Sequence, residues 1–248
     1  MNIGMVLNLG WGPAALLLLA LPALRNPRNT RWLLLTVAII LADSIATLIP
    51  FIYRPLLIPH LHYNWSGKLI DIAVMVTIML ALVASGAFRR TDLGFSLRQA
   101  PGSRRDTALV AIPFLLLVAV LAATEWGNTT LPNPETILYE ATLPGLAEEL
   151  AWRGLLLALF DRMFAGRVTI LGASLGYGAI ATSLVFGFVH GVQFDSKLVL
   201  HTALDNGIFA AVTGLVLVWI RARTKSLVFP ILTHNATNLV LESVPLLH

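Results

Sequence analysis

The chain has 248 residues, of which 57% are hydrophobic and 12% are charged, and its mean hydropathy is +0.79. Soluble domains carry roughly 25% charged residues, so this composition excludes an ordinary water-soluble globule and indicates an integral membrane protein. The absence of cysteine excludes disulfide scaffolds, thiolate metal sites and cysteine nucleophiles. The formal net charge of +4 fits either a nucleic-acid partner or a membrane topology, and the positions of the cations decide between the two.

Apolar segments long enough to cross a bilayer follow one another along almost the whole chain. A transmembrane helix needs about 20 apolar residues, and we predict eight such helices, near residues 3–24, 32–51, 69–88, 107–124, 137–160, 168–190, 198–220 and 227–247. Glycines at 172, 176 and 178 leave open a later start for the sixth helix. The pattern predicts an all-α, multi-pass (polytopic) membrane protein. A long polar connector divides it into N-terminal helices in residues 1–106 and a C-terminal group in residues 107–248.

The lysines and arginines are distributed unevenly between the two sides of these predicted helices. The connectors after the first, third, fifth and seventh helices contain 13 of the 17 cations, whereas the other side has Arg54, Lys68 and Lys197. By the positive-inside rule, the first side faces the cytosol and both termini are non-cytosolic. The excess of basic residues is therefore explained by the membrane topology, and we expect no nucleic-acid partner. The expected location is a membrane, the plasma membrane if the chain is prokaryotic.

The fifth predicted helix carries the densest group of ionisable residues, Glu140, Glu148, Glu149 and Arg153. Such side chains are costly inside a membrane, so each is a candidate functional residue. Glu149 and Arg153 are four residues apart on one helix face and can pair. Glu148 lies about 100° round the helix and has no cation at helical spacing, which suits a general base. The simpler alternative is an ion-pair cluster that only docks helices.

Two further predicted helices place a histidine four residues from a partner, Phe186 with His190 and His234 with Asn238. A lone histidine on an apolar helix is usually a hydrogen-bonded core residue. Two histidines together with Glu148 and an amide supply a base, imidazoles and hydrogen-bond donors. These are the groups needed to activate water and to stabilise an oxyanion.

Taken in chain order, the motifs EExxxR (148–153), FxxxH (186–190) and HxxxN (234–238) resemble those of the CPBP family. This family comprises CAAX-type prenyl proteases and bacteriocin-processing or immunity proteins, also called Abi. The resemblance covers about residues 137–247. It implies an intramembrane endopeptidase whose catalytic core is formed by the C-terminal four helices, within the C-terminal part 107–248. The expected substrate is a prenylated or membrane-associated protein or peptide at the lipid bilayer.

The family pattern also implies a role for each motif residue. Glu148 would activate water with help from His190, His234 and Asn238 would stabilise the oxyanion, and Glu149, Arg153 and Phe186 would support them. The family is commonly labelled metalloprotease, and Zn²⁺ could be held by Glu148, His190 and His234. Because there is no H-E-x-x-H motif and these residues come from three separate helices, the sequence requires no cofactor and leaves zinc open.

Some alternatives remain open at this level. The predicted topology places Glu148 near the middle of the membrane and His190 close to the non-cytosolic end, which disfavours a cytosolic prenylated substrate unless the sixth helix is shifted or the orientation is inverted. One rival function is a non-catalytic scaffold or bacteriocin-immunity protein of the same fold. Another is a small proton-coupled transporter, in which Asp43, Asp71 and a His201–Asp205 pair would carry protons. The simpler interpretation of His201 with Asp205 is a structural pair.

Overall fold

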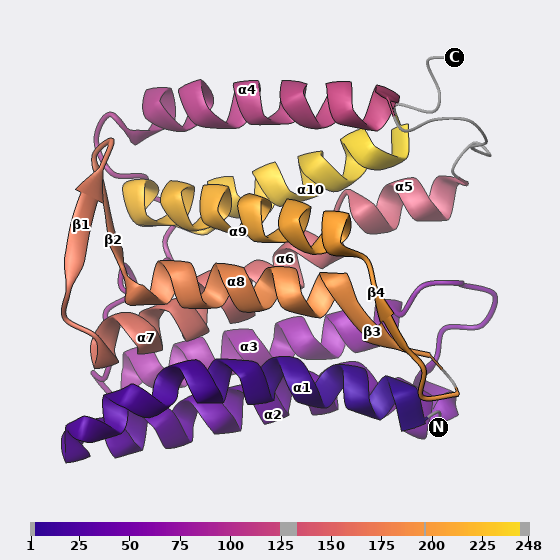
Figure 1. Cartoon of the computed structure of the whole chain (residues 1–248), viewed down its shortest axis with the longest axis horizontal. Helices are drawn as coiled ribbons and strands as arrows, with labels where there is room; N and C mark the ends of the chain where they lie inside the picture. The colour runs from indigo at the N-terminus through magenta and orange to yellow at the C-terminus, as the bar shows by residue number, and fades with distance from the viewer. Residues whose placement is uncertain (1–2, 125–132, 196, 244–248) are drawn as a thin grey trace.

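The computed structural model describes residues 3–124, 133–195 and 197–243 and is built mainly of helices (Figure 1). The α-helices are α1 (Ile3–Ala20), α2 (Thr30–Ile52), α3 (Trp65–Ala84), α4 (Ser103–Thr124), α5 (Pro134–Glu140), α6 (Leu143–Glu149), α7 (Leu157–Met163), α8 (Tyr177–Gly191), α9 (Leu204–Thr224) and α10 (Val228–Ser243). A π-helix, η4 (Leu150–Leu156), joins α6 to α7. Short 3-10 turns η1 (Leu21–Arg25), η2 (Pro27–Asn29) and η3 (Arg54–Leu56) flank α2. The all-α prediction is confirmed.

Several helices have the length and apolar character of membrane spans. Among the described residues, four segments meet both conditions, Pro27–Ile52, Trp65–Ala84, Ser103–Ala123 and Leu204–Thr224, and Gly10–Arg25 and Tyr177–Gly191 are shorter apolar helices. Their outward faces carry large apolar side chains, as on α4, where Leu109 is 65% exposed and Leu116 is 62% exposed. Such surfaces match lipid rather than water. The chain is therefore a membrane protein, and the total of eight spans stays a prediction.

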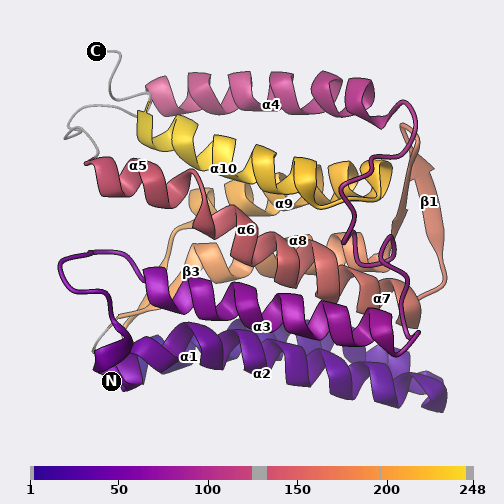
Figure 2. The ribbon, with the colours of Figure 1, turned by 180° about the vertical axis from the view of Figure 1, so that it is seen from behind.

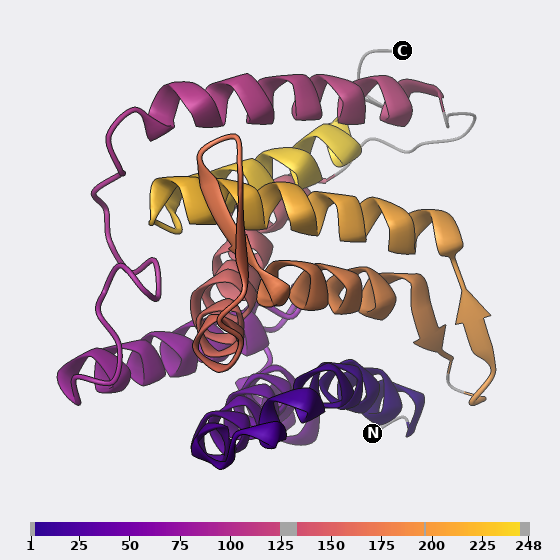
Figure 3. The same cartoon turned by 60° about the vertical axis from the view of Figure 1, so that its left-hand side comes forward.

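The helices run across the view in Figures 1 and 2, but Figure 3 shows α7 almost end-on and α4 and α9 along their length, so the helices cross at an angle. α2 packs on α3, and α1 packs on α2 and α8. α8 packs along α9, and α4 covers α10. The short helix α6 contacts both α3 and α10, so it lies between the N-terminal helices and the C-terminal ones. This central position places the two adjacent glutamates of α6 inside the bundle.

The predicted sixth and seventh helices begin too early, because β-hairpins precede the observed helices. β1 (Arg167–Ile170) pairs antiparallel with β2 (Ala173–Gly176) before α8 starts. Gly172 has φ +80° in the tight turn between them, a left-handed conformation that glycine adopts without strain. β3 (Val192–Phe194) pairs with β4 (Leu200–Thr202) in the same way before α9 starts. Residues 168–171 and 198–200 of these hairpins are mostly apolar, so hydropathy alone extends the adjoining helices through them.

The predicted fifth helix is also wrong as one continuous span, since the chain breaks between α5 and α6. Thr142 leaves the helical region with φ −130° and ψ −64°, and Pro144 begins the next helix. Asn235 of α10 forms hydrogen bonds with backbone groups on both sides of this break. Its Oδ1 accepts a hydrogen bond from the Gly145 N–H at 2.9 Å, and its Nδ2 donates to the Thr142 carbonyl at 3.2 Å. Irregular backbone at membrane depth needs such internal partners.

The cation-rich connectors meet at one end of the bundle. The segments that follow α1, α3, α7 and α9 all lie at the left of Figure 1, whereas η3, the start of α5 and the β3–β4 hairpin lie at the right. The alternation of sides deduced from the sequence therefore agrees with the helix directions. The assignment of the cation-rich end to the cytosol remains a prediction.

Candidate active site

The two adjacent glutamates lie at the junction of α6 with the π-helix η4, a kind of helix distortion that is frequent at functional sites. The predicted Glu149–Arg153 pair is present, with Arg153 Nη1 2.8 Å from Glu149 Oε1. Its side chains are 0% and 1% exposed. His234 of α10 joins the pair, since its Nδ1 lies 2.8 Å from the same Glu149 oxygen. The pair therefore holds α6, η4 and α10 together.

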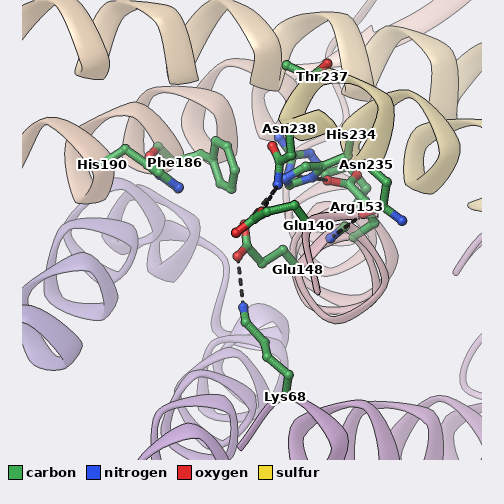
Figure 4. Close-up of polar contacts among 12 residues, drawn as sticks. Lys68, Glu140, Glu148, Arg153, Phe186, His190, His234, Asn235, Thr237 and Asn238 are labelled. Carbon is green, nitrogen blue, oxygen red and sulfur yellow. Dashed lines mark hydrogen bonds and ion pairs between the residues drawn. The ribbon is translucent and has the colours of Figure 1, made fainter. Parts of the chain in front are cut away.

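Glu148 has a cation partner that its own helix does not provide. Lys68 of α3 places its Nζ 2.9 Å from Glu148 Oε1, with side-chain exposures of 17% and 22% for the lysine and the glutamate (Figure 4). The expectation of an unpaired Glu148 is therefore wrong. Sequence reasoning treated Lys68 only as a connector cation. The signal that could have singled it out is that it begins an apolar helix on the side where few cations occur.

His234 lies between the two glutamates. A carboxylate oxygen accepts hydrogen bonds, so the contact with Glu149 assigns a proton to His234 Nδ1. The other ring nitrogen, Nε2, is 3.9 Å from Glu148 Oε2. This separation is too long for a direct hydrogen bond. It is a distance that a bridging water or substrate group between the two atoms can span. The imidazole is thus oriented by one glutamate and turned toward the other.

Phe186 and His190 stack on α8 as their spacing predicts, with ring centroids 4.4 Å apart. His190 Nδ1 lies 2.7 Å from the Phe186 carbonyl oxygen, which can only accept, so Nδ1 carries the proton and Nε2 is left as an acceptor. Arg153 also lies over the Phe186 ring, with its Cζ 4.3 Å from the ring centroid. Phe186 therefore connects the buried ion pair to His190.

Asn238 shares a helix face with His234, but its amide is engaged by another acid. Its Nδ2 donates a 2.8 Å hydrogen bond to Glu140 Oε2 at the end of α5 (Figure 4). Since an amide nitrogen has two N–H groups, one donor remains for another acceptor. Asn235, which the motif pattern did not include, is the residue that fixes the start of α6 through its hydrogen bond with the Gly145 N–H. Its position next to His234 inside an apolar helix is the only sequence signal for it.

Glu148 and His190 both line one cavity, which has a volume of about 210 Å³. Trp152 and Phe186 also line it, and the N-terminal helices contribute Lys68, Asp43 and Asp71. Asp71 is 2% exposed, and its Oδ1 has no hydrogen-bond partner among the described residues. His234 contacts Glu148 from outside this set of lining residues. The candidate site thus consists of a cavity with both apolar and ionisable lining residues between α1–α3 and α8, with α10 behind the glutamates.

The suggested zinc ligands do not form a metal site in this arrangement. Within residues 3–124, 133–195 and 197–243, no three His, Asp or Glu side chains are grouped so that they could hold a metal ion. On both histidine rings Nδ1 has a protein partner, Glu149 for His234 and the Phe186 carbonyl for His190, which leaves Nε2 as the other nitrogen of each ring. No chemical step is therefore assigned to a metal.

The predicted His201–Asp205 pair is wrong. His201 lies on β4 and its Nε2 is 3.1 Å from Asp195 Oδ2 in the β3–β4 turn. Asp205 stands in the first turn of α9, where a carboxylate stabilises the helix N-terminus. Neither residue lines the cavity that contains Glu148. This part of the proposed proton path is therefore separate from the candidate site.

The C-terminal part of the chain matches a known protein-family model. Residues 130–240 match the family model described as type II CAAX prenyl endopeptidase Rce1-like. The segment thus carries an Rce1-like domain of the CAAX protease type, which confirms the resemblance seen in the motifs. It includes α5–α9 and most of α10 but none of α1–α4. Comparisons with curated proteins and with solved structures gave no significant match.

Proposed function

We propose that the protein is an intramembrane endopeptidase that hydrolyses a peptide bond of a prenylated or membrane-associated protein or peptide. The observation that carries this proposal is the environment of Glu148. Its carboxylate lies 2.9 Å from Lys68 Nζ and 3.9 Å from His234 Nε2, and it lines a cavity with His190. The Rce1-like family supports a protease with a protein substrate at the membrane.

In this mechanism Glu148 acts as the general base. A water molecule in the cavity gives a proton to the Glu148 carboxylate while its oxygen attacks the carbon of the scissile carbonyl. The carbonyl oxygen becomes an oxyanion, and the C–N bond then breaks as Glu148 returns the proton to the leaving amine. His190, whose Nε2 is free to accept, orients the water or the departing group.

The remaining polar residues stabilise charge around this reaction. The proposed oxyanion donors are the free N–H of Asn238 and the Nε2–H of His234 in its doubly protonated form. Glu149 orients the His234 ring by accepting from Nδ1–H, and Arg153 compensates the charge of Glu149. Lys68 compensates the negative charge of Glu148 before the proton is transferred. Each of these partners acts in a low-dielectric space, where such interactions are strongest.

The decisive experiment compares the wild type with Glu148→Gln in a cleavage screen. The substrates are prenylated C-terminal peptides on one side and transmembrane or exported peptides on the other, presented to the purified protein in lipid. Glu148→Gln should abolish cleavage while thermal unfolding shows a folded protein. Glu135→Gln, a matched substitution at the start of α5, should cleave as the wild type does. Unchanged cleavage by Glu148→Gln would refute the mechanism.

The mechanism needs no cofactor, and zinc dependence is tested separately. Metal analysis of the purified protein and the effect of a chelator on cleavage provide the test. We expect substoichiometric zinc and chelator-insensitive cleavage, because no three His, Asp or Glu side chains are grouped to hold a metal ion in the part of the chain that the structure describes. One bound zinc per chain, with activity lost on chelation and restored by zinc, would overturn this expectation.

One observation favours a transporter as the second candidate. Asp43, Asp71, Lys68 and Glu148 line the same cavity, and such chains of ionisable groups inside a membrane can carry protons. Reconstituted vesicles distinguish the functions, since a transporter would give substrate-coupled proton movement in the absence of any cleavage. A non-catalytic scaffold or immunity protein of the same fold would give neither signal.

A further inference from the structure

A second, larger cavity lies away from Glu148, at the end of the bundle where the cation-rich connectors meet. Its volume is about 600 Å³, and its walls come from the α3–α4 connector, α7, the β1–β2 hairpin and the end of α9 (Figure 3). Five cations line it, Arg89, Arg162, Arg167, Arg221 and Lys225. The carboxylates in its lining are Asp92 and Asp161. The cavity therefore carries an excess of positive charge.

The two carboxylates compensate only part of this charge. Asp92 Oδ1 pairs with Arg89 Nη2 at 3.2 Å, and Asp161 Oδ2 pairs with Arg167 Nη2 at 2.7 Å. Arg162, Arg221 and Lys225 form no ion pair with any residue that the structure describes. Arg162 is held instead by the Ala87 carbonyl and by the Phe88 ring, whose centroid is 4.7 Å from its Cζ. Three cations around one space thus have no ion-pair partner among the described residues.

Arg221 is the most deeply placed of these cations, with an exposure of 4%. Its Nη2 donates to the carbonyls of Thr91 and Asp92 at 3.1 and 2.8 Å. Its Nε is buried without a hydrogen-bond partner among the described residues. Gly94, at φ +67°, packs its backbone against the guanidinium, and a side chain there would overlap it. A buried guanidinium without an anion is unfavourable, so the arrangement gains stability when an anion enters.

Lys225 brings a second unpaired charge to the same cavity. It ends α9 in the left-handed conformation, with φ +60°, and its side chain is exposed. Burial, followed by the nearby cations Arg221 and Arg167, lowers the pKa of the Lys225 ammonium below its usual value. The lining cations therefore repel one another. A bound anion would relieve this repulsion.

We propose that this cavity binds a phosphate group, supplied either by the headgroup of an anionic phospholipid or by a free phosphate-bearing anion. Arginine forks match phosphate oxygens in geometry and charge. Basic pockets between transmembrane helices on the cytosolic side of a membrane commonly bind lipid headgroups. The cavity lies at the helix ends, at headgroup level for a bundle that spans the bilayer. This binding function is independent of peptide hydrolysis.

The test uses the full-length protein purified in detergent and has two arms. In the first, inorganic phosphate is titrated against sodium chloride of equal ionic strength while thermal unfolding is followed. In the second, native mass spectrometry compares retention of phosphatidylglycerol with that of phosphatidylcholine. We expect saturable binding in at least one arm. Lys225→Gln, which removes an exposed and unpaired cation, should weaken it about tenfold, equivalent to about 1.4 kcal/mol.

Arg105→Gln is the matched control, because Arg105 is an exposed cation at the same end of the bundle but outside the cavity. It should bind as the wild type does. Preferential retention of phosphatidylglycerol without an effect of inorganic phosphate assigns the site to a headgroup. Saturable phosphate binding without a lipid preference assigns it to a free anion. Failure of both arms, or equal weakening by Arg105→Gln and Lys225→Gln, overturns the proposal.

Discussion

Replacing Arg153 with methionine removes the cation that compensates Glu149 in the centre of the helix bundle. The two side chains are 1% and 0% exposed, and their Nη1 and Oε1 atoms are 2.8 Å apart. Methionine keeps an unbranched apolar chain in place of the arginine stem, so little volume is lost. Of the partners that the structure describes for the Glu149 carboxylate, the hydrogen bond from His234 is the one that stays behind. The substitution therefore isolates the effect of an uncompensated buried charge.

The expected cost follows from this burial. Removing one partner of a buried ion pair costs about 3–5 kcal/mol, because the other charge stays without compensation. Arg153 also lies over the Phe186 ring at 4.3 Å, and losing this contact acts in the same direction. A chain of this size loses roughly 2–4 °C of melting temperature for each kcal/mol. Arg153→Met should therefore lower the unfolding midpoint by about 10 °C.

Thermal unfolding in one detergent provides the assay. The double variant Glu149→Gln/Arg153→Met removes both charges, and it should regain about 2 kcal/mol relative to Arg153→Met alone. Arg104→Met, at an exposed position of α4, serves as the control for the arginine-to-methionine change. The reasoning fails if Arg153→Met is no less stable than Arg104→Met. It fails equally if the effects of the two single substitutions simply add in the double variant.

Three further predictions concern contacts between helices or at helix ends. Lys68→Met should lower kcat/KM for peptide cleavage at least about tenfold, because Glu148 loses the cation that favours its ionised form. Lys68→Arg keeps the charge and should retain most activity. Equal activity in the two variants would exclude this role for Lys68. Asn235→Ala should lower the free energy of unfolding by about 1–3 kcal/mol for each backbone group it leaves unpaired, and a chemical or thermal unfolding curve checks this. For Glu135, burial is outweighed by hydrogen bonds from His62, Tyr63 and Trp65, which lower its pKa from 4.5 to about 2. Its contribution to stability is therefore present above about pH 4.5 and lost as the pH falls toward 2, so the wild type should lose its advantage over Glu135→Gln in that window.

Contacts within one helix were predictable from the sequence, because the helical repeat fixes which residues share a face. Glu149 with Arg153 and Phe186 with His190 are both separated by four residues, and both contacts are present. The apolar runs likewise predicted α2, α3, α4 and α9 as long apolar helices. The helix ends were less predictable. Val168 and Ile170 are as apolar as a membrane helix requires, yet they belong to an exposed hairpin strand.

Contacts between helices were not predictable, because the repeat does not determine how one helix is rotated against the next. Lys68–Glu148, Glu149–His234, Gly145–Asn235 and Glu140–Asn238 join residues 80, 85, 90 and 98 positions apart. The first three depend on the packing of α6 against α3 and α10, and the fourth depends on the packing of α5 against α10. The residue types alone showed which side chains needed partners inside a membrane. Only the packing shows which partners they have.

The predicted division at residue 106 would place residues of the candidate site on both of its sides. The matched segment, residues 130–240, contains Glu148 and His190, whereas the cation beside Glu148 comes from α3. Docking of helices and catalysis are therefore not competing explanations for the charged residues of α6 and η4. Glu149 and Arg153 have no access to the cavity, and their burial suits an ion pair that docks helices and orients His234. Glu148 is 22% exposed and lines the cavity, so it is the carboxylate of the two that water and a peptide can reach.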